Sequence, residues 1–303
     1  MGKDTCDKNK SCPTCDTASQ CSQAEKESRE QAVLDQRMSS VKYKCMVMSG
    51  KGGVGKSTVA TNLAVMLVQE GYAVGLMDAD IHGPNIPKML GIEDQRPSAT
   101  PEGLLPITTP TGLKVISVGL FLRTQDDPII WRGPLKHSVI KQFLGEVYWG
   151  DLDFLIIDLP PGTGDEVLSV AHLLKGVDGA LIVTTPQDVA LTDSRKAVSF
   201  ARQLQLPLVG IIENMSGFTC PHCHEAIDLF KKGGGEQAAR ELLVPFMGRI
   251  PICPEMVTCG DSGNPAVSHP EYKDAVNAFK TIARNWRQLL EEQSGDLSRA
   301  EKA

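Results

Sequence analysis

Short apolar runs alternate with longer amphipathic stretches from about residue 42 to the end of the chain. Six of the runs are almost continuously apolar, which is typical of strands buried on both faces of a parallel sheet. They read YKCMVM, AVGLM, LKVISVG, FLIID, GALIVTT and LVGIIEN. Because helix-like stretches separate them, the order of elements predicts a doubly wound, mainly parallel α/β sheet with right-handed crossovers.

Two other regions depart from this alternation. Near the C-terminus, apolar residues recur at spacings of three and four, which predicts an amphipathic helix packed on the domain: Val276, Phe279, Ile282, Ala283, Trp286, Leu289 and Leu290. Residues 92–112 are rich in Pro, Thr and Gly and predict a long surface excursion.

The first 40 residues form a separate compositional zone, with mixed charges, many Ser and Gln, and few bulky apolar side chains. Such a segment cannot bury enough apolar surface to order itself, so it predicts a flexible arm unless a metal organises it. The expected division is therefore a cysteine-rich arm at 1–40 and an α/β domain at 41–303.

The overall composition excludes some partners. The chain of 303 residues carries a formal charge of −6, and this mild acidity argues against nucleic acid as a main partner. The sequence contains no apolar run long enough to cross a bilayer and no signal peptide, which predicts a cytoplasmic protein that does not bind membranes. Nine cysteines are many for that compartment, and their clustering favours metal or redox chemistry over disulfides.

A phosphate-binding loop follows the first strand. Gly50-x-x-x-x-Gly55-Lys56-Ser57 lies between that strand and a predicted helix, which is the context the motif requires. Backbone N–H groups of such a loop and the helix N-terminus bind phosphate oxygens, Lys56 would reach the β- and γ-phosphates, and Ser57 would coordinate Mg²⁺. The predicted ATP contacts are Gly50, Lys51, Gly52, Gly53, Val54, Gly55, Lys56, Ser57 and Thr58.

Three aspartates follow two other predicted strands. Ligands of open α/β sheets bind at the carboxyl ends of the strands, where Asp78, Asp80 and Asp158 are expected. Asp158 fits the carboxylate that holds Mg²⁺ through water, and Asp80 fits the one that orients the attacking water. Asp78 has two open interpretations, a catalytic role or structural support of its loop.

A C-x-x-C pair, Cys220 and Cys223, follows the strand LVGIIEN. Two thiolates can chelate one metal but cannot close a tetrahedral site. Further ligands must come from elsewhere in the chain, from the adjacent His222 and His224, or from a second subunit. A bound cluster, a structural zinc site and a redox pair remain open on spacing alone.

Three motifs together, KGGVGKST with an early lysine, DAD and DLPPGTGD, resemble the deviant phosphate-loop (deviant Walker A) ATPases. That class includes the nitrogenase iron protein and the MinD division-site ATPase. The resemblance implies a homodimer in which Lys51 reaches the phosphates bound by the other subunit. It also implies slow ATP hydrolysis, with Lys51, Lys56, Asp80 and Asp158 as the catalytic residues.

A narrower resemblance rests on DADIHGPNIPKMLG, WRGPLK and ENMSGFTCPHC. These motifs are similar to the Mrp-type (ApbC-like) iron–sulfur carrier ATPases over about residues 40 to 290. The resemblance implies a [4Fe–4S] cluster bridged between two subunits by Cys220 and Cys223 of each, and its transfer to apo-proteins. It also implies that Asn214 contacts adenine, with a turn-capping asparagine as the alternative.

The N-terminal cysteines, Cys6, Cys12, Cys15 and Cys21, supply enough thiolates for a cluster of their own. Their pattern resembles the ferredoxin-like site of the eukaryotic cytosolic scaffold branch of the same family. The gap between Cys6 and Cys12 is shorter here than in that branch, so the resemblance leaves open whether Cys6 is the fourth ligand. A zinc site and a thiol-rich arm without metal are the alternatives.

Two other functions are compatible with the phosphate loop. One is electron transfer, as in the nitrogenase iron protein, whose ligands are single, widely separated cysteines rather than a pair. The other is a MinD-like positioning ATPase, which needs an amphipathic tail for the membrane. The last residues here, EEQSGDLSRAEKA, are strongly polar and do not favour that function.

Overall fold

The computed structural model describes residues 22–101, 103–122, 133–174, 176–220, 222–223 and 225–300. A single sheet of eight strands runs through the molecule in the order β12-β9-β8-β1-β7-β2-β6-β5. All neighbouring strands in it are parallel except β5 and β6. The strands are β1 (Val41–Met48), β2 (Val74–Asp78), β5 (Ile107–Thr108), β6 (Lys114–Ser117), β7 (Leu152–Asp158), β8 (Gly179–Thr184), β9 (Val209–Glu213) and β12 (Phe246–Arg249).

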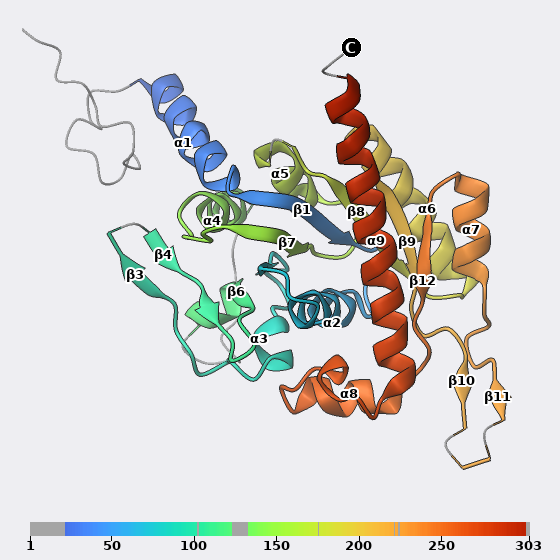
Figure 1. Cartoon of the computed structure of the whole chain (residues 1–303). Coiled ribbons are helices and arrows are strands. Elements are labelled where there is room, and N and C mark those ends of the chain that lie inside the picture. The colour runs from blue at the N-terminus through green and yellow to red at the C-terminus, as the bar shows by residue number, and fades with distance from the viewer. Residues whose placement is uncertain are drawn as a thin grey trace, which may run out of the picture.

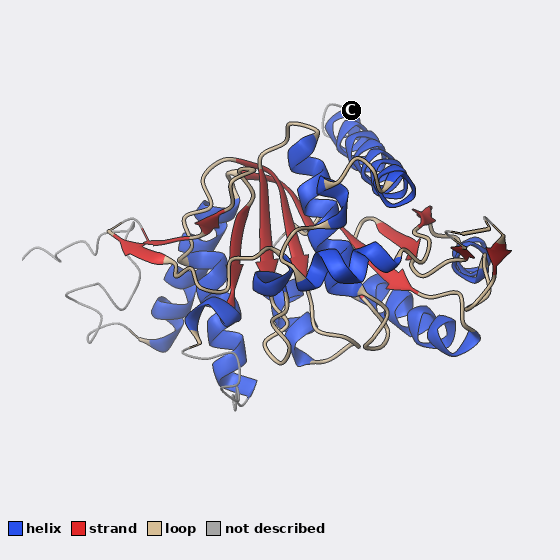
Figure 2. Cartoon of the chain, turned by 90° about the horizontal axis from the view of Figure 1, so that it is seen from below, coloured by secondary structure: helices blue, strands red, loops and turns tan. Residues whose placement is uncertain are grey.

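This sheet confirms the predicted α/β class, and each of the six apolar runs is one of its strands. Strand β1 shows why two cores form. Cys45 and Val47 point to one face and Met46 and Met48 to the other, because successive side chains of a strand alternate. Helices cover both faces (Figure 2).

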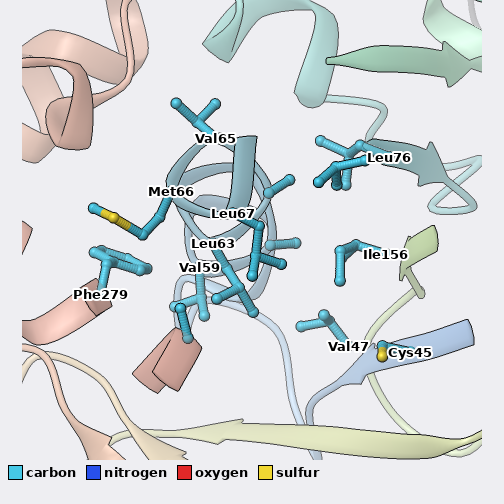
Figure 3. Packing of buried hydrophobic residues seen from close by; sticks show 14 of the residues in the cluster. Cys45, Val47, Val59, Leu63, Val65, Met66, Leu67, Leu76, Ile156 and Phe279 are labelled. Carbon is cyan, nitrogen blue, oxygen red and sulfur yellow. The ribbon is translucent and has the colours of Figure 1, made fainter. Parts of the chain in front are cut away.

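One face is covered by α2 (Lys56–Gln69) and α9 (Lys273–Ala300). Figure 3 shows α2 nearly end-on, with the sheet side chains Leu76, Ile156 and Val47 on one side of the helix and Phe279 of α9 on the other. The other face is covered by α4 (Gly133–Gly145), α5 (Asp165–Leu173), α6 (Asp188–Gln203) and α7 (Gly234–Leu242). Short elements complete the chain: α3 (Ile86–Met89), β3 (Ser98–Thr100), β4 (Gly103–Leu105), η3 (Val118–Phe121), α8 (Pro254–Asp261) and η4 (Ala266–Ser268).

The predicted C-terminal helix is confirmed as α9. Phe279, Ile282 and Trp286 are fully buried against the sheet face. The indole N–H of Trp286 also donates to the sulfur of Cys45 at 3.2 Å. Cys45 is therefore a core residue, and its burial raises the pKa of its thiol to about 12. None of the described helices is long and apolar enough to span a bilayer.

The prediction of a flexible arm through residue 40 is wrong for its last part. Helix α1 (Gln23–Met38) begins with a capping box between Ser22 and Glu25. Leu34 and Met38, one helical turn apart, are 1% and 4% exposed and belong to the core beneath α4. Glu30 of α1 also pairs with Lys141 of α4, and the Gln31 amide donates to the carbonyl of Leu173. These tertiary contacts hold a polar helix in place, which the composition of the segment did not indicate.

A two-stranded hairpin, β10 (Phe218–Thr219) and β11 (Ala226–Ile227), connects β9 to α7. It projects from the edge of the molecule opposite to the start of α1, as both views show (Figures 1 and 2). Cys220 and Cys223 lie in the turn between its two strands.

Candidate functional site

The phosphate loop is held in a close-fitting position between two other segments. On one side, a side-chain carbon at Gly50 would lie 2.2 Å from the backbone of Asp193 in α6. On the other side, a carbon at Gly55 would lie 2.3 Å from the side-chain nitrogen of Asn214. Gly55 also has a φ of 80°, which favours glycine. These two glycines are therefore required by packing as well as by phosphate geometry.

Lys56, Ser57 and Asp158 meet at the start of α2. The Lys56 ammonium is 2.7 Å from Oδ1 of Asp158 and 3.3 Å from the Ser57 hydroxyl. Burial raises the pKa of Asp158, and the charge of Lys56 opposes this rise. Oδ2 of Asp158 is buried and has no hydrogen-bond partner in the part of the chain that the structure describes. An unpaired carboxylate oxygen beside a hydroxyl fits a Mg²⁺ site.

Asp78 and Asp80 have different surroundings although they are two residues apart. Asp78 is 1% exposed, and its carboxyl group accepts hydrogen bonds from the Ser117 hydroxyl at 2.8 Å and from the Asp80 N–H at 3.1 Å. Burial, followed by the charge of Asp158, raises the pKa of Asp78 to about 8. Asp80 is only half-buried and accepts from the N–H of Gly83. This geometry favours loop support for Asp78 and leaves Asp80 nearer to solvent.

Lys51 lies in the same loop but has different surroundings from Lys56. Its side chain is half-buried. The hydrogen bonds and ion pairs within the described residues do not include it. A lysine beside a phosphate site, with no hydrogen-bond or ion-pair partner among the described residues, can pair with a negative charge that lies outside its own subunit.

A pocket of about 400 Å³ adjoins the loop. Gly55 and Thr58 form its phosphate end, and Asn214 lies in its wall. The Asn214 amide N–H donates to the carbonyl of Val54 at 2.9 Å. This bond ties Asn214 to the phosphate loop, and the same residue also faces the pocket. Met89 and Met215 of the wall lie within the quoted motifs DADIHGPNIPKMLG and ENMSGFTCPHC. The rest of the wall has no motif that could have revealed it: Phe230, Pro251, Ile252, Cys253, Met256 and Val257.

The hairpin presents its two cysteines to solvent. Cys223 is exposed and Cys220 is half-buried. Hydrogen bonds from the backbone of Cys223, and then from that of His222, lower the pKa of the Cys220 thiol and favour the thiolate that metals bind. The pair lies in a hairpin turn, whereas a thioredoxin-type redox pair is placed at a helix N-terminus.

No group of three or more His, Cys, Asp and Glu side chains within the described ranges could hold a metal ion. His222 is exposed, and His224 lies outside the described residues. The predicted N-terminal ligands Cys6, Cys12, Cys15 and Cys21 also lie outside them. The described part of one chain therefore offers two thiolates at the hairpin.

The fold and the loop define a P-loop NTPase: a parallel sheet with the phosphate loop after β1 and carboxylates at the ends of β2 and β7. A model of the ParA family, described as NUBPL iron-transfer P-loop NTPase, matches residues 40–287. The chain belongs to this family.

Curated relatives agree with that membership. An iron–sulfur cluster carrier protein of Methanococcus maripaludis is 50% identical, with 88% of this chain and 94% of that protein covered. A cytosolic Fe-S cluster assembly factor, the NUBP2 homolog of Nematostella vectensis, is 46% identical, with 82% and 95% covered.

Solved structures agree as well. A nucleotide-binding protein of Archaeoglobus fulgidus in complex with ADP superposes with a TM-score of 0.71 at 39% identity, covering 80% of this chain and 96% of that one. The cell division ATPase MinD of Pyrococcus furiosus superposes with a TM-score of 0.60 at 22% identity, covering 82% and 99%, and shares the fold.

Proposed function

We propose that this protein is an ATP-dependent carrier of iron–sulfur clusters in the cytoplasm. A homodimer would hold one [4Fe–4S] cluster as cargo through Cys220 and Cys223 of each subunit and pass it to apo-proteins. The observation that carries this proposal is the pair of thiols on a hairpin turn, one exposed and one half-buried, with no third ligand grouped with it in the described residues. The names of the two relatives support it.

The need for a second subunit follows from ligand number. A [4Fe–4S] cluster takes four thiolates, and one hairpin supplies two. Helix α1 starts at the opposite end of the molecule from the hairpin (Figure 1). Cys6, Cys12, Cys15 and Cys21 precede it and are themselves four thiolates, the number that one cluster takes. We assign these cysteines to a separate cluster and the missing ligands of the hairpin to a second copy of the chain.

The nucleotide site fits ATP hydrolysis with Mg²⁺ bound by Ser57 and, through water, by Asp158. Mg²⁺ would neutralise phosphate charge. Lys56 would move from Asp158 to the phosphates, Asp80 would orient the attacking water, and Lys51 would add a positive charge across the dimer interface. Slow turnover is the expected rate, because the trans contact forms only when the dimer closes.

Asn214 is placed to contact the base. One N–H of its amide donates to the Val54 carbonyl, which leaves the second N–H and the carbonyl oxygen for other partners. The carbonyl oxygen can accept from the exocyclic amine of adenine, so we assign adenine as the base.

The decisive experiment is anaerobic reconstitution with iron and sulfide, quantified as iron per dimer and by absorption and EPR spectra. Wild type is compared with Cys220→Ala/Cys223→Ala and with a chain that lacks residues 1–21, which leaves α1 in place. The double variant should lose the bridging cluster, and the truncation should lose only the N-terminal one.

The control is Cys259→Ala, which removes a buried thiol of α8 that is part of neither the hairpin nor the pocket wall. It should retain every cluster. Binding of zinc without iron to the hairpin cysteines would refute the carrier function and leave the ATPase assignment intact.

A further inference from the structure

A single buried side chain, Glu213 at the end of β9, hydrogen-bonds to both ends of the cysteine hairpin. We call these ends its feet: the N-terminal foot at Ser216, before β10, and the C-terminal foot at residues 233–235, after β11. Its carboxylate is fully buried. On the N-terminal foot, Oε1 accepts a hydrogen bond from the Ser216 hydroxyl. On the C-terminal foot, Oε1 accepts from the Gly233 N–H at 2.9 Å and Oε2 accepts from the Gly235 N–H.

The glycine run KKGGGE at the C-terminal foot is shaped around this carboxylate. A side-chain carbon at Gly235 would lie 3.0 Å from both Cβ and Oε2 of Glu213. Gly233 has a φ of 87° and begins α7 without a side-chain cap of its own. Backbone N–H groups at a helix start normally attract an anion. Here Glu213 fills that role, so the glycines serve the hairpin rather than a second phosphate site.

The next residue in the chain, Asn214, is bound to the phosphate loop through Val54. Met215 follows with a φ of 55°, a left-handed conformation that costs free energy for a residue with a side chain and is found where surrounding contacts impose it. Three consecutive residues thus connect the nucleotide loop, a strained backbone and the hairpin foot.

The wall of the base pocket is bonded to the same segment. The N–H of Ile250 donates to the carbonyl of Glu213 at 2.8 Å, and the N–H of Ile252 donates to the carbonyl of Gly217 at 2.8 Å. Ile252 lines the pocket, as does Phe230 from the far side of the hairpin. A nucleotide base in this pocket would contact the hairpin directly and its feet through one layer of hydrogen bonds.

We infer that Glu213 is a positioning residue that ties the orientation of the Cys220/Cys223 turn to the occupancy of the nucleotide pocket. The inference rests on the proposed function for its purpose, since the turn is the cluster site. It can be tested without iron, because the hydrogen bonds that form the link lie within the chain itself. With Glu213 in place, a change at the loop or pocket wall moves both feet together. Without the negative charge of Glu213, the two feet no longer move with the pocket wall.

The test is the rate of alkylation of Cys220 and Cys223 by iodoacetamide, resolved by peptide mass spectrometry on the full reduced chain. Rates are measured without nucleotide, with Mg²⁺–ADP, and with a Mg²⁺-bound non-hydrolysable ATP analogue. In wild type the analogue should change the rate at least about fivefold, the lower end of typical coupling between sites. In Glu213→Gln this change should fall to less than about twofold while nucleotide affinity is kept, as expected for a residue that carries coupling and not binding.

Glu241→Gln is the matched control. It makes the same chemical change at an exposed position of α7, where Glu241 pairs with Arg195 and not with the hairpin, and it should retain the full response. If Glu213→Gln proves unfolded by circular dichroism, Ser216→Ala replaces it, because this substitution removes the bond at one foot and keeps the carboxylate. The response of Ser216→Ala should then be smaller than that of wild type.

Two results would overturn the inference: an unchanged response in the folded Glu213→Gln variant or in its replacement, or no response in wild type. Iron reconstitution separates these results from the carrier function. If the protein binds its cluster but wild type and Glu213→Gln show the same nucleotide response, only the role of Glu213 is refuted. A chain that loses the response with Glu213→Gln but binds no iron refutes only the carrier function.

Discussion

The two lysines of the phosphate loop should respond differently to removal. Lys56 is 6% exposed and lies 2.7 Å from Asp158, which is fully buried. Breaking a buried pair by removing one partner typically costs about 3–5 kcal/mol of unfolding free energy. Burial already raises the pKa of Asp158, so without Lys56 that carboxyl group can take up a proton and avoid a buried charge. Lys56→Ala should therefore cost about 3 kcal/mol of unfolding free energy, the lower end of this range. Lys51 has no such partner, so Lys51→Ala should change stability by less than about 0.5 kcal/mol.

Removal of Lys51 should affect turnover and not stability. We expect Lys51→Ala to bind nucleotide with nearly wild-type affinity and to lose turnover by about 10³-fold, the lower range for a charge supplied from another subunit to a phosphoryl transition state. Urea unfolding measures the stabilities, and phosphate release under saturating ATP measures turnover. An equal loss of stability in both variants would mean that Lys51 is a packing residue.

Mixing variants distinguishes action between subunits from action within one. Lys51→Ala and Asp80→Asn should each be inactive alone. In a one-to-one mixture, half of the dimers contain one subunit of each variant. In such a dimer, the site of the Lys51→Ala subunit has an intact Asp80 and receives Lys51 from the Asp80→Asn subunit, so one of its two sites is complete. The mixture should recover about one quarter of wild-type turnover, as random pairing in a twofold dimer requires. No recovery in a mixture shown to exchange subunits would refute the trans role of Lys51.

Two further predictions concern stability. The folded pKa of Asp78 is raised by burial from 3.8 to about 8, so between these pH values the folded chain keeps a proton that the unfolded chain releases, and stability falls as pH rises. Asp78→Asn should therefore gain stability relative to wild type in urea unfolding as pH increases from about 5 to 8, and a constant difference would contradict the burial argument. Leu34→Ala should cost about 2–5 kcal/mol, measured against the exposed Gln36→Ala, which should cost under about 0.5 kcal/mol. Equal effects would mean that α1 is not docked.

The sequence predicted those parts of the molecule whose signal is local. An apolar run that needs burial on both faces specifies a central strand, and Gly50 to Ser57 specifies a phosphate loop because each residue type has a direct role there. Helix α1 was missed because the contacts that hold it are tertiary, and those with α4 reach about a hundred residues along the chain. The base pocket was missed for the same reason, since Phe230 and α8 reach it only through tertiary packing.

The placement of the cysteine hairpin explains how ATP could act on a cluster it does not contact. ATP can change cluster affinity only by the difference in its own affinity for two states of the chain. A coupling of about 1–3 kcal/mol changes affinity by about 5- to 150-fold. Hydrogen bonds to a charged group contribute about 1.5–3 kcal/mol each, and Glu213 accepts three of them at the hairpin feet. Rearranging even one of these bonds therefore supplies enough free energy for such a coupling. A small shift of the loop at Asn214 can change the affinity for the cluster without unfolding the hairpin.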